Sequence, residues 1–129
     1  MNDTQREMLV SAALAAHARA YAPYSKFAVG AALLCADGTV VSGCNVENVS
    51  FGLSNCAERS AVFSAVSQGH KEFVAIAVAS SGAFSPCGAC RQVLAEFCRD
   101  LQVLLVDATS GQITGQTTLN ALLPQRFEW

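Results

Sequence analysis

The sequence predicts an α/β fold in three layers, with one mixed five-stranded sheet between helices. Helix and strand patterns alternate along the chain in the order α-β-β-α-β-α-β-β-α. Residues 73–79 and 102–106 are almost continuously apolar, as strands buried on both faces are. Asp37-Gly38 separates two further strand patterns and is typical of a tight hairpin. On size alone, we expect residues 1–129 to form a single domain.

The N-terminal part predicts a helix followed by the hairpin. Residues 4–20 carry an apolar stripe of small side chains, which indicates an amphipathic helix. Thr4 and Glu7 have the spacing of a capping box at its start. Residues 27–36 and 39–45 predict the two antiparallel strands of the hairpin.

The C-terminal part predicts three more helical segments and three more strands. A helix over residues 56–68 would have Asn55 as its N-cap, and Gly69 would end it. A helix over residues 86–97 would carry Pro86 in its first turn, where the missing N–H is not needed. The remaining elements are predicted at residues 73–79, 102–106, 113–117 and 119–123. The last two strands are too close in sequence for a parallel crossover, so we expect them to be antiparallel.

Composition limits the function classes. The net charge is −2 and no cluster of Lys and Arg is present, so we expect no nucleic-acid polymer as partner. No apolar run approaches the ~20 residues of a membrane span, and the N-terminus does not resemble a signal peptide. We therefore expect no membrane association and a cytoplasmic location. The 52% hydrophobic content indicates apolar surface that is buried between subunits.

Six cysteines are present, and a disulfide scaffold is disfavoured because an export signal is missing. A two-residue hairpin turn would place Cys35 opposite Val40. Val40 lies four residues, or ~13 Å along the strand, from Cys44, so Cys35 and Cys44 would be too far apart for a disulfide. Cys35, Cys44 and Cys98 are predicted to be buried free thiols.

The other three cysteines indicate a metal site. Cys87 and Cys90 share one face of a predicted helix start, and Cys56 lies at the start of another. Helix N-termini favour the thiolate form that zinc binds. Three protein ligands leave one position open, as catalytic Zn²⁺ sites do. Two alternatives stay open at this point: a structural zinc site closed by a fourth ligand such as His70, and a redox pair of Cys87 and Cys90.

Two neighbours of Cys56 have side chains that such a site needs. Zn²⁺ with three thiolates has a formal charge of −1, which opposes ionisation of a bound water. Arg59 lies three residues after Cys56, on the same side of the helix, and can withdraw that charge through hydrogen bonds to ligand sulfurs. Glu58 is the candidate acid and base for proton transfer.

Cys56-Ala57-Glu58-Arg59, followed by Pro86-Cys87-Gly88-Ala89-Cys90, resembles the zinc-dependent cytidine deaminases. The resemblance extends over roughly residues 4–127 and is to the small, homotetrameric members. Further matching motifs are Tyr24-Ser25-Lys26-Phe27, Val29-Gly30-Ala31-Ala32, Asn45-Val46-Glu47-Asn48, and Leu122-Leu123-Pro124 with Phe127.

The resemblance implies hydrolytic deamination of cytidine and 2′-deoxycytidine in pyrimidine salvage. A zinc-bound hydroxide would attack C4, with Glu58 as proton shuttle and not a ligand. The substrate contacts that the resemblance implies are Phe27 against the pyrimidine, Asn45 and Glu47 on the ribose 3′-hydroxyl, the Ala57 backbone near the base, and Phe127 from a neighbouring subunit. Phe51 stands where relatives often carry a Tyr that reaches the sugar across a subunit boundary, so that contact is in question.

Two other functions fit parts of the pattern. A deaminase of a cytosine nucleoside antibiotic of the blasticidin S type would share the zinc motif, although the Asn45–Asn48 motif favours ordinary cytidine. A zinc-stabilised interaction module without catalysis would share the three cysteines. An assay with cytidine separates both from a cytidine deaminase.

Overall fold

A computed structural model describes residues 1–129, and its elements follow the predicted order. The helices are α1 (Asp3–His17), α2 (Ala57–Ser67), α3 (Gly88–Phe97) and α4 (Leu119–Leu122), with a short 3-10 helix at Phe51–Leu53. The strands are β1 (Val29–Cys35), β2 (Val40–Cys44), β3 (Phe73–Ser80), β4 (Gln102–Asp107) and β5 (Ile113–Thr118).

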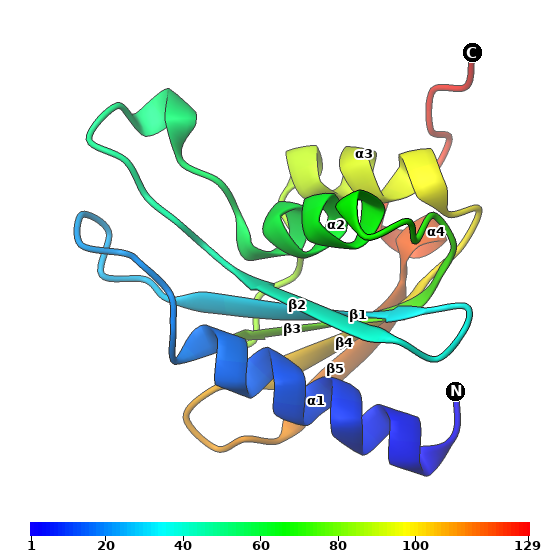
Figure 1. Cartoon of the computed structure of the whole chain (residues 1–129), viewed down its shortest axis with the longest axis horizontal. Coiled ribbons are helices and arrows are strands. Elements are labelled where there is room, and N and C mark those ends of the chain that lie inside the picture. Colours follow the sequence, from blue (N-terminus) through cyan, green and yellow to red (C-terminus); the bar gives the residue numbers. More distant parts are fainter.

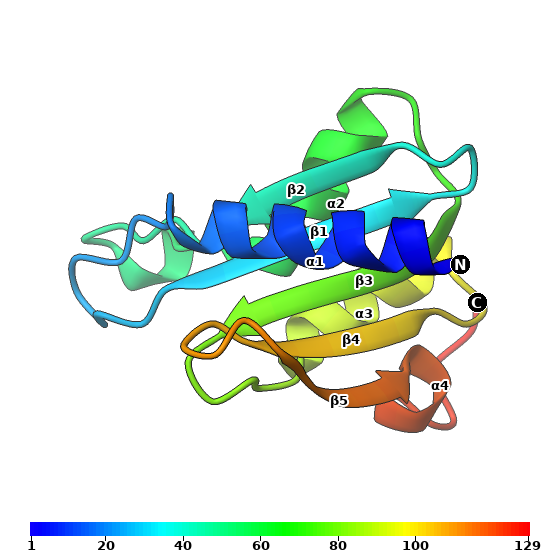
Figure 2. The same ribbon diagram turned by 90° about the horizontal axis from the view of Figure 1, so that it is seen from below.

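The five strands form one mixed sheet in the order β2-β1-β3-β4-β5. Only β3 and β4 pair in parallel, and the other neighbours are antiparallel. α1 covers one face of the sheet, while α2 and α3 lie side by side on the other (Figures 1 and 2). The predicted three-layer α/β fold is therefore confirmed.

Each face of the sheet has its own apolar core. Leu33, Ile76 and Val78 point to the α2 and α3 side, where they pack with Val62 and Leu94. The intervening residues of the strands pack against α1 on the opposite face. Because β3 is buried on both faces, its sequence reads as one apolar run.

Two glycines let the helices approach the sheet closely. A Cβ on Gly30 of β1 would lie 2.2 Å from the carbonyl oxygen of Ala13 in α1. A Cβ on Gly43 of β2 would lie 2.4 Å from the backbone nitrogen of Ala61 in α2. The close contact at Gly43 sets how near α2 lies to the sheet. This matters for the candidate site, because several of its side chains belong to the first residues of α2.

The helix starts differ from the predictions. Asn2 caps α1 and forms the capping box with Gln5, so the Thr4–Glu7 box was wrong. The helix also ends at His17 rather than at residue 20. Asn is as good an N-cap as Thr, and a cap at residue 2 gives the helix two further residues.

The N-caps of α2 and α3 are Cys56 and Cys87, so the predicted roles of Asn55 and Pro86 were wrong. Neither cysteine caps its helix through a side-chain hydrogen bond. Asn55 instead donates to Ser60 Oγ. Both cysteine side chains are therefore free for another role.

The hairpin turn is one residue longer than predicted. Leu34 pairs with Val40, and the Cys35 N–H donates to the Thr39 carbonyl, so Cys35 lies opposite Thr39 and not Val40. Gly38 has a φ of +91°, which closes the longer turn. All six cysteines are free; Cys35 and Cys98 are buried as predicted, whereas Cys44 is only half-buried.

No helix of the chain has both the length and the apolar character needed to cross a bilayer.

Candidate metal centre and substrate pocket

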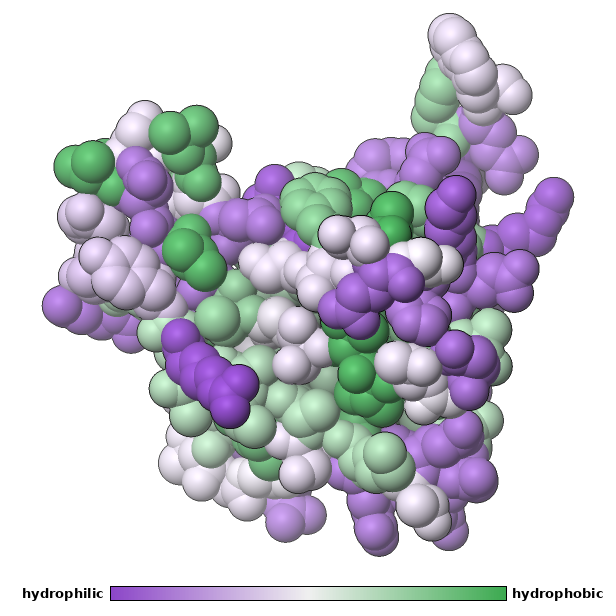
Figure 3. Space-filling view, in the orientation of Figure 1, coloured by the Kyte–Doolittle hydropathy of each residue, from purple (hydrophilic) through white to green (hydrophobic).

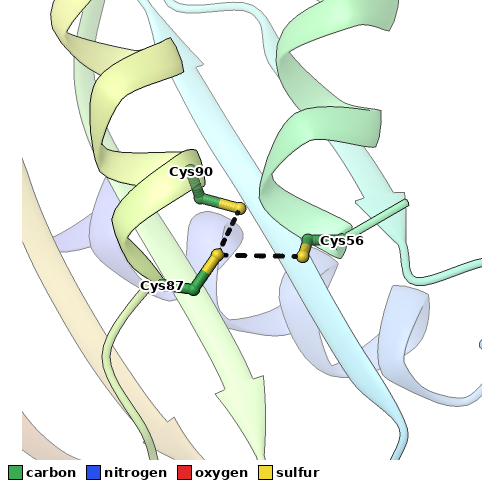
Figure 4. A group of neighbouring side chains, drawn as sticks. All are labelled: Cys56, Cys87 and Cys90. Carbon is green, nitrogen blue, oxygen red and sulfur yellow. Dashed lines mark hydrogen bonds between the residues drawn. The ribbon is translucent and has the colours of Figure 1, made fainter. Parts of the chain in front are cut away.

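Three sulfur atoms converge between the N-terminal ends of α2 and α3 (Figure 4). Cys56 Sγ lies 4.0 Å from Cys87 Sγ, which lies 3.5 Å from Cys90 Sγ. Cys56 comes from the start of α2, and the other two from the start of α3. Parallel packing of these two helices on one face of the sheet thus unites ligands that are 31 residues apart in sequence.

The spacing of the sulfurs fits zinc. Two thiolates at Zn–S distances of ≈ 2.3 Å in a tetrahedral site lie about 3.8 Å apart. The observed 3.5 and 4.0 Å are on either side of this value. No fourth Cys, His, Asp or Glu joins the cluster, and His70 instead lies 3.7 Å from Asp37. The chain therefore offers an open three-sulfur site and not the closed site with His70.

The sulfurs share protons unequally. A hydrogen bond from Cys90 lowers the pKa of Cys56 to about 5, and Arg59 adds to this effect. The same hydrogen bond and burial raise the pKa of Cys90. Metal binding must displace the proton from Cys90, so occupancy of the site depends on pH.

Arg59 directly contacts the cluster, as the sequence predicts. Its Nη2 donates to Cys56 Sγ at 3.2 Å, and this bond raises the pKa of the guanidinium further above its ordinary value. Its Nε is buried without a hydrogen-bond partner. Burying an unpaired N–H costs free energy. The attraction between the Arg59 guanidinium and the negatively charged Cys56 sulfur offsets this cost and holds Arg59 in place.

Glu58 is one of the two buried polar residues of the chain, with 5% of its surface exposed. Burial raises the pKa of its carboxyl, and the neighbouring Cys56 thiolate adds to the effect. A carboxyl with a raised pKa can both accept and donate a proton near neutral pH.

A cavity of about 330 Å³ lies beside the sulfur cluster, and Cys56 and Cys87 are among the residues that line it. Most of the residues predicted for the site line it: Phe27, Asn45, Glu47, Cys56, Ala57, Glu58 and Cys87. The cavity is lined by aromatic, polar and metal-binding side chains at once, which is the character of a small-molecule site.

The sequence model of the "Cytidine and deoxycytidylate deaminase zinc-binding region" matches residues 3–106. The chain belongs to this deaminase family. A cytidine deaminase of Sporosarcina psychrophila is 50% identical over 94% of this chain and 90% of its own. A blasticidin-S deaminase of Bacillus cereus is 31% identical over 80% and 79%, respectively. The crystal structure of a cytidine deaminase from Burkholderia pseudomallei, 48% identical, matches 98% of this chain and 100% of its own with a TM-score of 0.88.

Membership in the deaminase family also settles the metal. The matched region is named for zinc binding, and the cluster of Cys56, Cys87 and Cys90 lies within it. The predicted Zn²⁺ cofactor is confirmed, and with it the prediction of a zinc-dependent enzyme.

Four predicted residues are not among those that line the cavity: Cys90 and Arg59, which belong to the sulfur cluster, and Phe51 and Phe127, which lie away from it. Phe51 is 74% exposed on the loop between β2 and α2, where its ring meets Tyr24 edge-on. Phe127 is 72% exposed and lines a different cavity, at the C-terminal end of α3, beside Trp129. Neither contacts the cavity of its own chain, so a role in substrate binding would need another subunit.

The pocket has a second aromatic wall, which no sequence pattern predicted. Phe84 lines the cavity, and its ring packs edge-on against Phe27 with centroids 6.0 Å apart. It sits on a turn in which Gly82 and Ala83 both have positive φ. No local pattern in residues 80–85 distinguishes this position from an ordinary loop residue.

Arg91 was also missed. It donates from Nε to the Pro86 carbonyl at 2.7 Å, from Nη2 to Ser85 Oγ at 3.1 Å, and from Nη1 to the Leu122 carbonyl at 2.8 Å. These bonds tie the segment before Cys87 to the end of α4. Its spacing of four residues from Cys87 could have revealed it, as the spacing from Cys56 revealed Arg59.

Proposed function

We propose that this chain deaminates free cytidine and 2′-deoxycytidine hydrolytically, giving uridine and 2′-deoxyuridine in pyrimidine salvage. The observation that carries the proposal is a buried carboxyl, Glu58, beside three sulfurs at zinc spacing, at a nucleoside-sized cavity that Glu58, Cys56 and Cys87 line. The 50% identity to a cytidine deaminase supports the choice of substrate.

When bound, zinc supplies a Lewis acid that makes water acidic enough to become a nucleophile at neutral pH. The chain's own part in the reaction is proton transfer by Glu58. Its carboxylate accepts a proton from the attacking water and passes it to the ring nitrogen. It then takes the remaining proton from the new hydroxyl at C4 and gives it to the departing amine, so that ammonia leaves and C4 becomes a carbonyl. Burial in the cavity floor supports this role, because it brings the pKa of the carboxyl closer to neutral pH.

The substrate contacts belong to the same proposal. Phe27 packs on the pyrimidine, the Ala57 backbone contacts the base near the sulfurs, and Asn45 and Glu47 bind the ribose 3′-hydroxyl. All four line the cavity. Phe127 reaches the site of a neighbouring subunit in a homotetramer, and its exposure in the single chain supports this role.

Phe51 occupies a corresponding place on the rim of a neighbour's site. It carries no hydroxyl, so it would contribute apolar contact to that site and no hydrogen bond to the sugar.

The partner is a small nucleoside. A net charge of −2 and the absence of a basic cluster disfavour binding of a polynucleotide. Three free thiols at one site need a reducing compartment, which supports the cytoplasm as location.

The test is an ultraviolet assay of zinc-loaded protein with cytidine, 2′-deoxycytidine and blasticidin S as separate substrates. We expect conversion of the first two and little or none of the antibiotic, and loss of activity after chelation of the zinc. Preferred conversion of blasticidin S would assign the chain to the activity named for the 31% identical relative. No conversion of any of the three would favour a zinc-stabilised interaction module.

A further inference from the structure

Residues 24–28 include Phe27, which forms a wall of the pocket, and have no regular secondary structure; β1 begins directly after them, at Val29. Lys26, in the middle of this loop, has a φ of +61°, a conformation that costs free energy in a residue with a side chain. Backbone groups of such a loop need partners, and here two site residues supply them.

Glu47 holds the first half of the loop. Its Oε1 accepts hydrogen bonds from the N–H of Tyr24 at 3.0 Å and from the N–H of Ser25 at 3.1 Å. Its Oε2 accepts a hydrogen bond from the Ser25 hydroxyl. A carboxylate has about four acceptor positions, so three are used within the chain and one on Oε2 stays open.

The Ser25 hydroxyl that contacts Glu47 also contacts the backbone of Phe27, the residue of the aromatic wall. Its Oγ, which donates to Glu47, accepts the Phe27 N–H at 3.0 Å. Asn45 completes the arrangement, since its Nδ2 donates to the Phe27 carbonyl and its Oδ1 accepts from the Val29 N–H, both at 2.8 Å. The backbone of Phe27 is thus held on both sides by side chains that line the cavity.

We propose that Ser25 is a positioning residue that couples recognition of the nucleoside sugar to the aromatic wall against the base. Its hydroxyl fixes the rotation of the Glu47 carboxylate, so that one acceptor position faces a sugar hydroxyl. The same oxygen fixes the backbone of Phe27. The inference rests on the proposed function, because it takes the ligand of Glu47 to be the 3′-hydroxyl of a nucleoside.

The charge state of Glu47 supports this arrangement. Hydrogen bonds from Ser25 hold the pKa of the Glu47 carboxyl below its usual range. The group is therefore ionised at neutral pH and can only accept hydrogen bonds. The open acceptor position of Glu47 therefore favours a hydrogen-bond donor. A sugar hydroxyl is such a donor, whereas an ether oxygen or the hydrogen atom of a deoxy position is not.

The test compares cytidine with 3′-deoxycytidine in zinc-loaded wild-type protein and in the Ser25→Ala variant. One hydrogen bond to a charged group corresponds to roughly 10–100-fold in an equilibrium constant when it is lost. We expect Ser25→Ala to lower kcat/KM for cytidine by about tenfold, mainly through KM. For 3′-deoxycytidine we expect about a threefold loss, because only the support of Phe27 is removed. Zinc content should stay that of wild type.

Three further variants complete the design. Ser25→Thr keeps the hydroxyl and should restore most of the preference for the 3′-hydroxyl. Ser25→Cys keeps the size with a weaker donor and should give an intermediate preference, and it carries the test if Ser25→Ala does not fold. Ser67→Ala, at an exposed serine at the end of α2, is the matched control and should behave as wild type.

Equal losses for both substrates, or no loss for either, would overturn the role of Ser25. Failure of the wild-type protein to convert cytidine would instead overturn the proposed function. The two failures are therefore distinguishable.

Discussion

The floor and the rim of the pocket are held by different forces. The floor consists of Cys56, Glu58 and Cys87, which stand on or at the start of two helices packed into an apolar core. The rim consists of loop residues such as the exposed Ser25 and the half-buried Glu47, which are held by hydrogen bonds between side chains and backbone. The comparison teaches that apolar packing positions the residues of the floor, while hydrogen bonds to the backbone position those of the rim.

The two regions also differ in completeness. The floor is complete in one chain, because all three sulfurs and Arg59 meet there. On the rim, Phe51 and Phe127 are exposed and do not line the pocket of their own chain. Apolar side chains gather on the projecting loop between β2 and α2, where Val49, Phe51 and Leu53 are each more than 70% exposed (Figure 3). Exposed apolar clusters of this kind mark contact surfaces.

The largest expected effect of a single substitution in the floor is that of Glu58→Gln. Glutamine keeps the size of the side chain and cannot exchange a proton, so we expect kcat to fall by ~10²–10⁴ while zinc content stays unchanged. The measurement is steady-state kinetics beside metal analysis. Glu7→Gln, at an exposed residue of α1, is the control and should retain full activity. Near-normal turnover in Glu58→Gln would show that proton transfer lies elsewhere.

A smaller effect is expected at Arg59, which supports the floor through a sulfur. Arg59→Gln removes the positive charge 3.2 Å from Cys56 Sγ, and such outer contacts often change metal affinity or activity by ~10–100-fold. Activity should fall near pH 7, because the more negative site holds its protons more tightly, and recover partly as the rising pH removes them.

The measurement for Arg59 is a pH–rate profile at matched zinc occupancy. Arg19→Gln, at an exposed arginine after α1, is the control. Superimposable profiles of wild type and Arg59→Gln would make Arg59 an ordinary helix cation.

The smallest effect is expected on the rim, at Phe127. Truncation after Pro124 would remove it, but would also remove Arg126, which binds the carbonyls of Cys98 and Arg99 at the end of α3. Phe127→Ala is therefore the cleaner change. We expect KM for cytidine to rise by about tenfold, the effect of losing one buried aromatic contact, with zinc content unchanged.

Subunit mixing then tests whether the Phe127 ring acts between chains. Mixed assemblies of Glu58→Gln and Phe127→Ala subunits should recover activity, because some sites then combine an intact floor with an intact neighbouring ring. Trp129→Ala, next to Phe127, is the control. A fully active monomer in sedimentation would contradict the shared site.

The sequence predicted the floor well because its signals are local. Cysteine spacing within one helical turn, a carboxylate and an arginine beside Cys56, and apolar runs for β3 and β4 each depend on a few neighbouring residues. The register of the hairpin and the caps of three helices were predicted less well. Several nearby residues could serve each of those roles, and small energy differences choose between them.

The sequence by itself determined the order of elements and predicted the three cysteines that the structure brings together, since these depend on periodicity and residue chemistry. Only the tertiary structure decided that Phe84 meets Phe27, that Ser25 bridges Glu47 to the Phe27 backbone, and that Phe51 and Phe127 leave their own pocket. Such contacts join residues up to 57 positions apart through turns with positive φ and through side-chain hydrogen bonds. The physical reason is that loop geometry depends on which distant groups satisfy the backbone, and no local pattern records those partners.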